Sequence, residues 1–132
     1  MAWDIQYLED AGVVQVTARG LHDRAMLRQL TRDAVAAGHA HDSARFLIDH
    51  RLTRLALGTA EIFDMPKRGE DAGFGAGLRI GIVIEPDSPA RADFEFYAIQ
   101  CGNLGIHFLR LFFDHAQALE WLSRDRSPRP AA

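Results

Sequence analysis

The stretch Arg45-Phe46-Leu47-Ile48-Asp49 is a short apolar run that ends in a carboxylate. A run of this length without polar alternation is typical of a strand buried on both faces of a sheet, and we expect it to be the central strand. The stretch Leu78-Arg79-Ile80-Gly81-Ile82-Val83-Ile84, closed by Glu85-Pro86-Asp87, predicts another strand.

Upstream of the central strand, the pattern predicts a hairpin followed by a helix. Residues 3–7 alternate between apolar and polar side chains, and after a short turn residues 13–17 are again rich in β-branched side chains. This pattern predicts two antiparallel strands, the second ending at Gly20. From residue 23 to residue 37 apolar side chains recur at steps of three and four, which predicts an amphipathic helix ending at Gly38.

Downstream, helices and strands are predicted to alternate. Residues 58–65 form a helical pattern that Pro66 and a series of glycines should end. Residues 89–102 predict a second helix, and residues 106–113 predict the last strand. Asp114, with a glutamine three residues later, has the spacing of a helix N-cap and predicts a final helix.

Together these elements predict an α/β fold with a single domain. We expect a mixed β-sheet of about five strands, in which an N-terminal antiparallel hairpin is followed by right-handed parallel crossovers, flanked by about four helices. Residues 1–124 are assigned to this domain and residues 125–132, rich in arginine and proline, to a disordered C-terminal tail.

Composition limits the classes of function. The 132 residues are 48% hydrophobic and 25% charged, as expected of a folded domain, and the formal net charge is -3. Lysines and arginines are spread along the chain and predict no basic stripe, so we expect no nucleic-acid partner. Cys101 is the single cysteine, which excludes an intrachain disulfide. With no export signal and no apolar run of membrane-spanning length, we expect a bacterial, cytoplasmic protein without a membrane span.

Several of these landmarks occur together in a known family. They are the hairpin with Gly20, the strands Phe46-Leu47-Ile48-Asp49 and Ile80-Gly81-Ile82-Val83, and Phe113-Asp114 followed by Ala118-Leu119-Glu120-Trp121-Leu122. The chain resembles the SpoIIAA-like family of the STAS superfamily over nearly its whole length. The resemblance rests on structural motifs, so it implies a fold more strongly than an activity.

The resemblance implies a non-enzymatic regulatory or protein-interaction domain. The best understood relatives antagonise anti-sigma factors and are switched by phosphorylation of a serine or threonine at the start of the helix after the central strand. The matching region here is residues 50–60, where the candidate hydroxyls are Thr53 and Thr59. This interpretation predicts a protein partner or self-association as a homo-oligomer, and no cofactor.

A second resemblance supports an alternative function. The outline is also similar to the CRAL-TRIO lipid-carrier fold, in which a mobile helix gates an apolar pocket. Residues 65–77 would be the gate, with Phe74 closing over the apolar surface of the sheet. The alternative is therefore a small carrier that binds a lipid or another apolar small molecule in a shallow groove.

The best candidate site is Asp49-His50-Arg51, at the end of the central strand. Open α/β sheets usually present ligand-contacting residues there. A histidine beside a carboxylate has the chemistry of a base, and with Arg51 it has the chemistry of an anion site, but adjacent residues of a strand point to opposite faces. In the alternative interpretation, Asp49 caps local backbone and Arg51 is solvated. The complete predicted ligand or partner surface is Asp49, His50, Arg51, Thr53, Thr59 and Phe74.

Other candidate groups are better explained without a site. The cluster of His39, His41 and Asp42 has ligand types suited to a transition metal, but a polar surface loop explains it better. Cys101 has the chemistry of a nucleophile, yet it shares a helical face with Phe94 and Tyr97 and is expected in the core. We therefore predict no metal site and no catalytic residues.

Overall fold

The computed structural model describes residues 2–68 and 77–124. Its five-stranded sheet consists of β1 (Trp3–Leu8), β2 (Val13–His22), β3 (Arg45–Leu55), β4 (Arg79–Val83) and β5 (Leu109–Phe112). The strands lie in the order β1-β2-β3-β4-β5; β1 pairs antiparallel with β2, and every later pair is parallel. The predicted mixed sheet with an N-terminal hairpin is confirmed.

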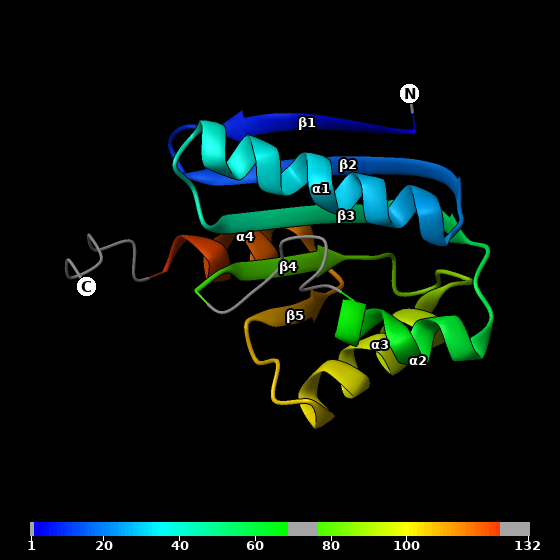
Figure 1. Ribbon diagram of the computed structural model, residues 1–132. Coiled ribbons are helices and arrows are strands. Elements are labelled where there is room, and N and C mark those ends of the chain that lie inside the picture. The colour runs from blue at the N-terminus through cyan, green and yellow to red at the C-terminus, as the bar shows by residue number, and fades with distance from the viewer. Residues whose placement is uncertain (1, 69–76, 125–132) are drawn as a thin grey trace.

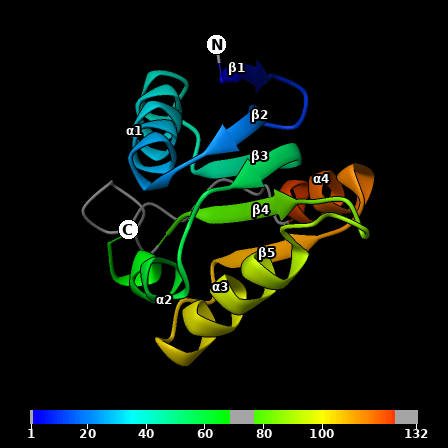
Figure 2. The same cartoon turned by 90° about the vertical axis from the view of Figure 1, so that its right-hand side faces the viewer.

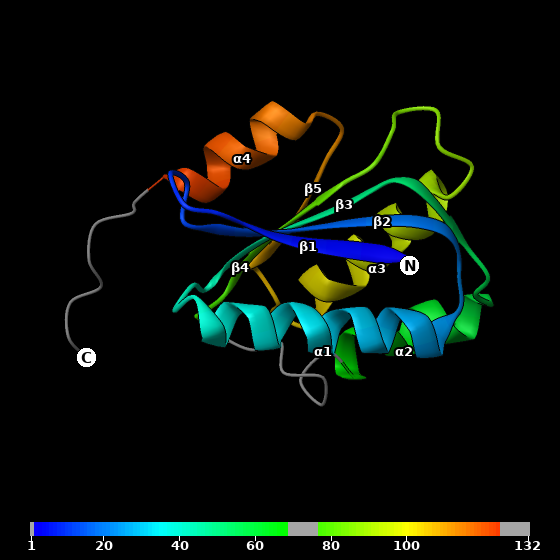
Figure 3. The ribbon, with the colours of Figure 1, turned by 90° about the horizontal axis from the view of Figure 1, so that it is seen from above.

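Helices cover both faces of this sheet. They are α1 (Arg24–Ala40), α2 (Thr59–Arg68), α3 (Arg91–Asn103) and α4 (His115–Ser123). Helices α1, α2 and α3 lie on one face and α4 lies alone on the other (Figures 1 and 2). The view from above separates the two layers most clearly (Figure 3).

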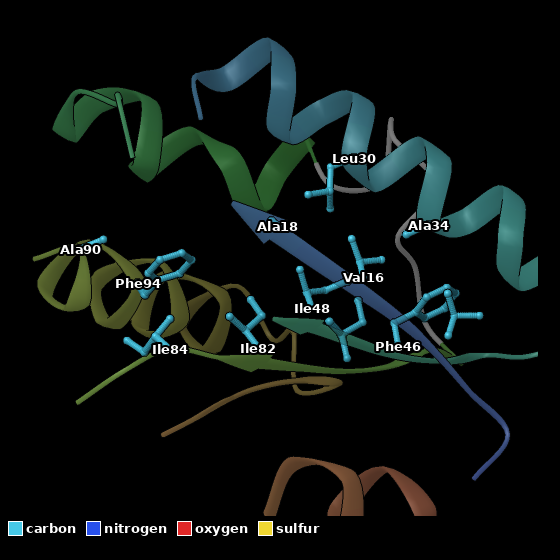
Figure 4. Packing of buried hydrophobic residues seen from close by; sticks show 12 residues of the cluster. Val16, Ala18, Leu30, Ala34, Phe46, Ile48, Ile82, Ile84, Ala90 and Phe94 are labelled. Atoms are coloured by element: carbon cyan, nitrogen blue, oxygen red, sulfur yellow. The ribbon is translucent and has the colours of Figure 1, made fainter. Parts of the chain in front are cut away.

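Two apolar cores result from this arrangement. The larger core joins Val16, Phe46, Ile48 and their neighbours to α1 and α3, where Leu30 and Phe94 contact it (Figure 4). The smaller core packs α4 onto the other face; its buried residues are Val13, Leu47, Val83, Phe112, Ala118 and Leu122. Phe46, Leu47 and Ile48 are all almost fully buried, as predicted for a central strand with helices on both faces.

The central strand is longer than its apolar run. It continues six residues past Asp49 to Leu55, and β2 continues past Gly20 to His22. The predicted strand ends were wrong because parallel pairing with β2 holds residues 52–55 in a strand despite their mixed polarity. Gly20 lies inside β2 with a φ of +85°, a conformation that glycine adopts without strain.

Three other predicted boundaries also differ. Helix α2 continues through Pro66 to Arg68, since a proline this close to the end removes one hydrogen bond and crowds one carbonyl but leaves the earlier turns intact. Helix α1 continues past Gly38, where a side chain would meet the ring of Phe46. Strand β5 begins at Leu109 because only residues 109–112 pair with β4. Residues 125–132, the predicted tail, lie outside the described residues.

Candidate functional site

A β-bulge shapes the end of the central strand. Thr17 pairs with Asp49, and the next registered pair is Arg19 with Leu52, so β3 carries one residue more than β2 across this step. An extra residue reverses the alternation of faces beyond it. Strict alternation would place certain side chains on either side of the bulge on opposite faces of the sheet. Because of the extra residue, these side chains lie on the same face.

Asp49 and Arg51 form a compact pair on the α4 side of the sheet. Oδ1 of Asp49 accepts hydrogen bonds from the backbone N–H and from Nε of Arg51, each at 3.0 Å, and Oδ2 accepts one from Nη2 at 2.8 Å. Burial alone would raise the pKa of Asp49, but the hydrogen bonds and charge of Arg51 outweigh it and hold the pKa below its usual value. Asp49 thus caps local backbone and also orients Arg51.

His50 points to the opposite face, into the layer of α1 to α3. Its side chain is buried, with Nδ1 3.0 Å from Oγ1 of Thr53 and its ring 5.1 Å from the ring of Phe94. The ring of His22 lies edge-on at 6.3 Å. Burial, followed by the charge on His22, lowers the pKa of His50 to about 3. At neutral pH its imidazole is uncharged, so it lacks the charge that attracts an anion.

The two predicted phosphorylation residues have different surroundings. Thr53 lies within β3 and is only 3% exposed, so its predicted place at a helix start was wrong. Thr59 is exposed and is the first residue of α2, where Oε1 of Glu61 accepts a hydrogen bond from the backbone N–H of Gly58. Phe74 lies outside the described residues.

A cavity of about 70 Å³ lies between the sheet and the three helices that cover this face. Its walls are mainly apolar, with His50 among the few polar groups. The lining residues are Leu27, Leu30, Thr31, Ile48, His50, Leu55, Leu57, Ile62, Met65, Ile80, Ile82, Asp93, Phe94, Tyr97 and Leu109. Apolar cavities known to take benzene measure roughly 150 Å³, so a lipid chain fits only after α2 moves outward.

Two exposed leucines lie on the other face of the same strand ends. Leu21 is 61% exposed and Leu52 is 68% exposed. The register places Leu21 opposite Arg54 and Leu52 opposite Arg19, so the leucines are diagonal neighbours on one face. We call these four residues the strand-end surface. The amino-acid sequence alone does not reveal this surface, because the surface depends on the extension of both strands beyond their apolar runs.

The remaining candidates have structural explanations. The ring of His41 stacks on Tyr7, with ring centroids 4.3 Å apart. Cys101 is buried in α3, and burial raises the pKa of its thiol to about 11, which keeps it protonated. Within residues 2–68 and 77–124, no group of three or more histidine, cysteine or acidic side chains is placed to hold a metal ion. No helix in this part of the chain is long and apolar enough to cross a membrane.

The sheet order, the hairpin and the division of helices between the two faces define a SpoIIAA-like α/β fold. A solved structure that shares this fold is that of an uncharacterized protein of the DUF3478 family from Shewanella loihica PV-4, described as SpoIIAA-like. The two chains align over 92% of each, with a TM-score of 0.53 and 20% sequence identity. No family model and no curated protein matches the chain. The resemblance to SpoIIAA-like proteins is thus confirmed at the level of the fold.

Proposed function

We propose that this protein is a non-enzymatic interaction domain that binds a protein partner, or a second copy of itself, through the strand-end surface. The observation that carries the proposal is the exposure of Leu21 and Leu52 side by side on a sheet face that α4 leaves uncovered. Fully burying one leucine side chain contributes about 1.5–3 kcal/mol, so two adjacent leucines supply a useful apolar anchor.

The surroundings of the leucines indicate the chemistry of the partner. A hollow of about 290 Å³ opens beside Leu21 and Arg54 and extends to Pro89 and Asp93 at the start of α3. Interfaces commonly combine a buried apolar anchor, a pocket and arginines at the rim. We therefore expect a partner that presents an apolar side chain to the hollow and a carboxylate to Arg54.

Substitution of Leu52 tests this proposal. Leu52→Gln removes the apolar contact, and Ile99→Gln, at a residue of α3 that is 60% exposed, is the matched control. Self-association is measured by light scattering over a range of protein concentrations, and partner binding by comparing the proteins captured by each variant. We expect Leu52→Gln to lose association while Ile99→Gln retains it. A monomer at every concentration, together with identical capture by both variants, would contradict the proposal.

We further propose Thr59 as the residue at which phosphorylation regulates partner binding. A phosphate on the first residue of α2 would be stabilised by the helix dipole, by about 0.3–1 kcal/mol, and repelled by Glu61. We expect peptide mass spectrometry of the protein from its native cells to find phosphate on Thr59 and none on the buried Thr53. Thr59→Glu should change partner binding, whereas Thr59→Ala should not. If Thr59 carries no phosphate under any growth condition tested, its role in regulation is refuted.

The apolar cavity favours a second function, the carriage of a small apolar molecule beneath α2. Ile62 is 2% exposed and lines the cavity, while the next residue, Phe63, is 44% exposed. Ile62→Trp should fill the cavity and Phe63→Trp is the matched control. Native mass spectrometry of freshly purified protein should show a bound apolar molecule that only Ile62→Trp removes. If the purified wild-type protein contains no ligand and takes up neither added oleate nor added benzene, the carrier function is excluded.

A further inference from the structure

Helix α1 carries three arginines in a line. Arg24, Arg28 and Arg32 are spaced four residues apart, which places their side chains one above the other on the helix surface. Ala25 and Gln29 lie beside them on the same face of α1. We call the three residues the arginine ladder. The expectation that basic residues form no stripe was wrong, because four-residue spacing becomes a line only on a helix.

Within the described part of the chain, the ladder has no acidic partner. The ion pairs found there involve Arg19, Arg51, Arg91 and Arg124. The acidic residues next to or within α1 are engaged elsewhere. Asp23 accepts a hydrogen bond from the backbone N–H of Met26, and Asp33 accepts hydrogen bonds from Trp3 and Gln29.

The isolated protein gains no stability from this arrangement. Like charges four residues apart destabilise a helix by about 0.2–0.5 kcal/mol for each pair, and the ladder contains two such pairs. Arg24 also lies in the first turn, where the positive end of the helix dipole disfavours a cation, although the N-cap carboxylate of Asp23 offsets part of this cost. Nε of Arg28 is buried without a hydrogen-bond partner among the described residues. An anionic binding partner would relieve the two charge costs, whereas the buried Nε lies out of its reach.

We propose that the arginine ladder is a docking surface for an acidic helix of a partner protein. Successive ladder residues rise about 6 Å along α1, the same rise that separates glutamates four residues apart on a second helix. The planar guanidinium group matches the geometry of a carboxylate and can bind it through two hydrogen bonds. Ala25 has a small side chain and leaves room for the partner beside the ladder.

Other anionic partners fit less well. A membrane-surface helix needs large apolar side chains beside its basic ones, and none of the exposed large apolar residues in the described chain lies on α1. The net charge of -3 gives no long-range attraction to a nucleic-acid backbone, whereas a short acidic helix is recognised locally. A second copy that docked a different surface on the ladder would make a heterologous contact, which gives a closed ring or an open-ended chain rather than a simple two-fold dimer.

The test uses a labelled synthetic helical peptide with glutamate at every fourth position and the same peptide with glutamine instead. Binding to the full protein is followed by fluorescence anisotropy at low and at physiological salt. We expect the glutamate peptide alone to bind, and added salt to weaken its binding. Arg28→Glu should weaken binding at least tenfold. Arg110→Glu, on β5, makes the same change in net charge and should leave binding within twofold of wild type.

Two further measurements keep the result interpretable. Arg28→Glu replaces two repulsive pairs by two attractive ones, so its melting temperature should equal or exceed that of wild type, which separates lost binding from unfolding. Leu52→Gln should leave peptide binding unchanged, because the ladder does not depend on the strand-end surface. Equal binding of both peptides, or equal weakening by Arg28→Glu and Arg110→Glu, would overturn the proposal. Ladder-dependent binding only to anionic vesicles or to a single-stranded oligonucleotide would also overturn it.

Discussion

The imidazole Nδ1 of His50 lies 3.0 Å from the hydroxyl oxygen of Thr53, three residues further along the same strand. In a regular strand, residues three apart point to opposite faces. The β-bulge opposite Ala18 brings both side chains to the face covered by α1, α2 and α3, where they form a buried polar pair beside His22. This pair influences both the pH dependence of stability and the cost of removing the hydroxyl of Thr53.

The first prediction concerns the dependence of stability on pH. The pKa of His50 falls from 6.5 to about 3 on folding, so below pH 6.5 the unfolded chain binds a proton that the folded protein does not. The contribution of His50 is fully present above pH 6.5 and is lost as the pH falls toward 3, by up to about 1.4 kcal/mol per pH unit. Urea unfolding of wild type between pH 7.5 and pH 5 should show this loss.

His50→Leu should reduce that pH dependence, and His39→Leu, at an exposed residue, is the control. At pH 7.5, His50→Leu should lower the free energy of unfolding by about 1 kcal/mol, since the hydroxyl of Thr53 loses its partner. An unchanged difference in stability between pH 7.5 and pH 5 in His50→Leu would show that another group titrates.

The second prediction concerns the hydroxyl of Thr53. Thr53→Val keeps the shape of the side chain but leaves Nδ1 of His50 buried without its partner, which should cost about 1–3 kcal/mol. Thr59→Val, at an exposed residue, should change the free energy of unfolding by less than about 0.5 kcal/mol. Chemical denaturation at neutral pH measures both variants, and equal effects would argue against the buried pair.

The third prediction compares two glycines in helices. At Gly38 an added Cβ would lie 2.6 Å from Cζ of Phe46 and 2.8 Å from the carbonyl oxygen of Ser43. Gly38→Ala should therefore destabilise the protein by about 1–3 kcal/mol, although alanine favours helix. At Gly102 no atom lies within 4 Å of the added Cβ. Gly102→Ala should be neutral or stabilising by up to about 1 kcal/mol, and thermal unfolding of the two variants should separate them clearly.

The fourth prediction concerns the reactivity of Cys101. The thiol is 2% exposed, and burial raises its pKa to about 11, so at pH 7.5 it is both protonated and inaccessible. Modification by a disulfide reagent should be slow in the folded protein and should accelerate in urea in parallel with unfolding. Rapid modification without denaturant would indicate that α3 opens locally and would contradict the packing around Tyr97.

The sequence by itself determined the elements whose signals are local. Alternation over residues 3–7 and 13–17 predicts the hairpin, since the period of a strand is visible within a few residues. The N-cap of helix α4 is an equally local signal. Oδ1 of Asp114 accepts a hydrogen bond from the backbone N–H of Gln117, three residues away. The apolar run Phe46-Leu47-Ile48 predicts a strand covered on both faces because no side of it is polar.

Only the tertiary structure decided what lies around the candidate site. The strand past Asp49, the bulge and the burial of Thr53 all depend on pairing with β2, which is more than thirty residues away in the chain. The spacing of Arg24, Arg28 and Arg32 is readable in the sequence, but the commitment of Asp23 and Asp33 to other donors is not. The physical reason is that strand register and charge pairing are contacts between distant segments, whereas periodicity and capping act within one turn or one strand.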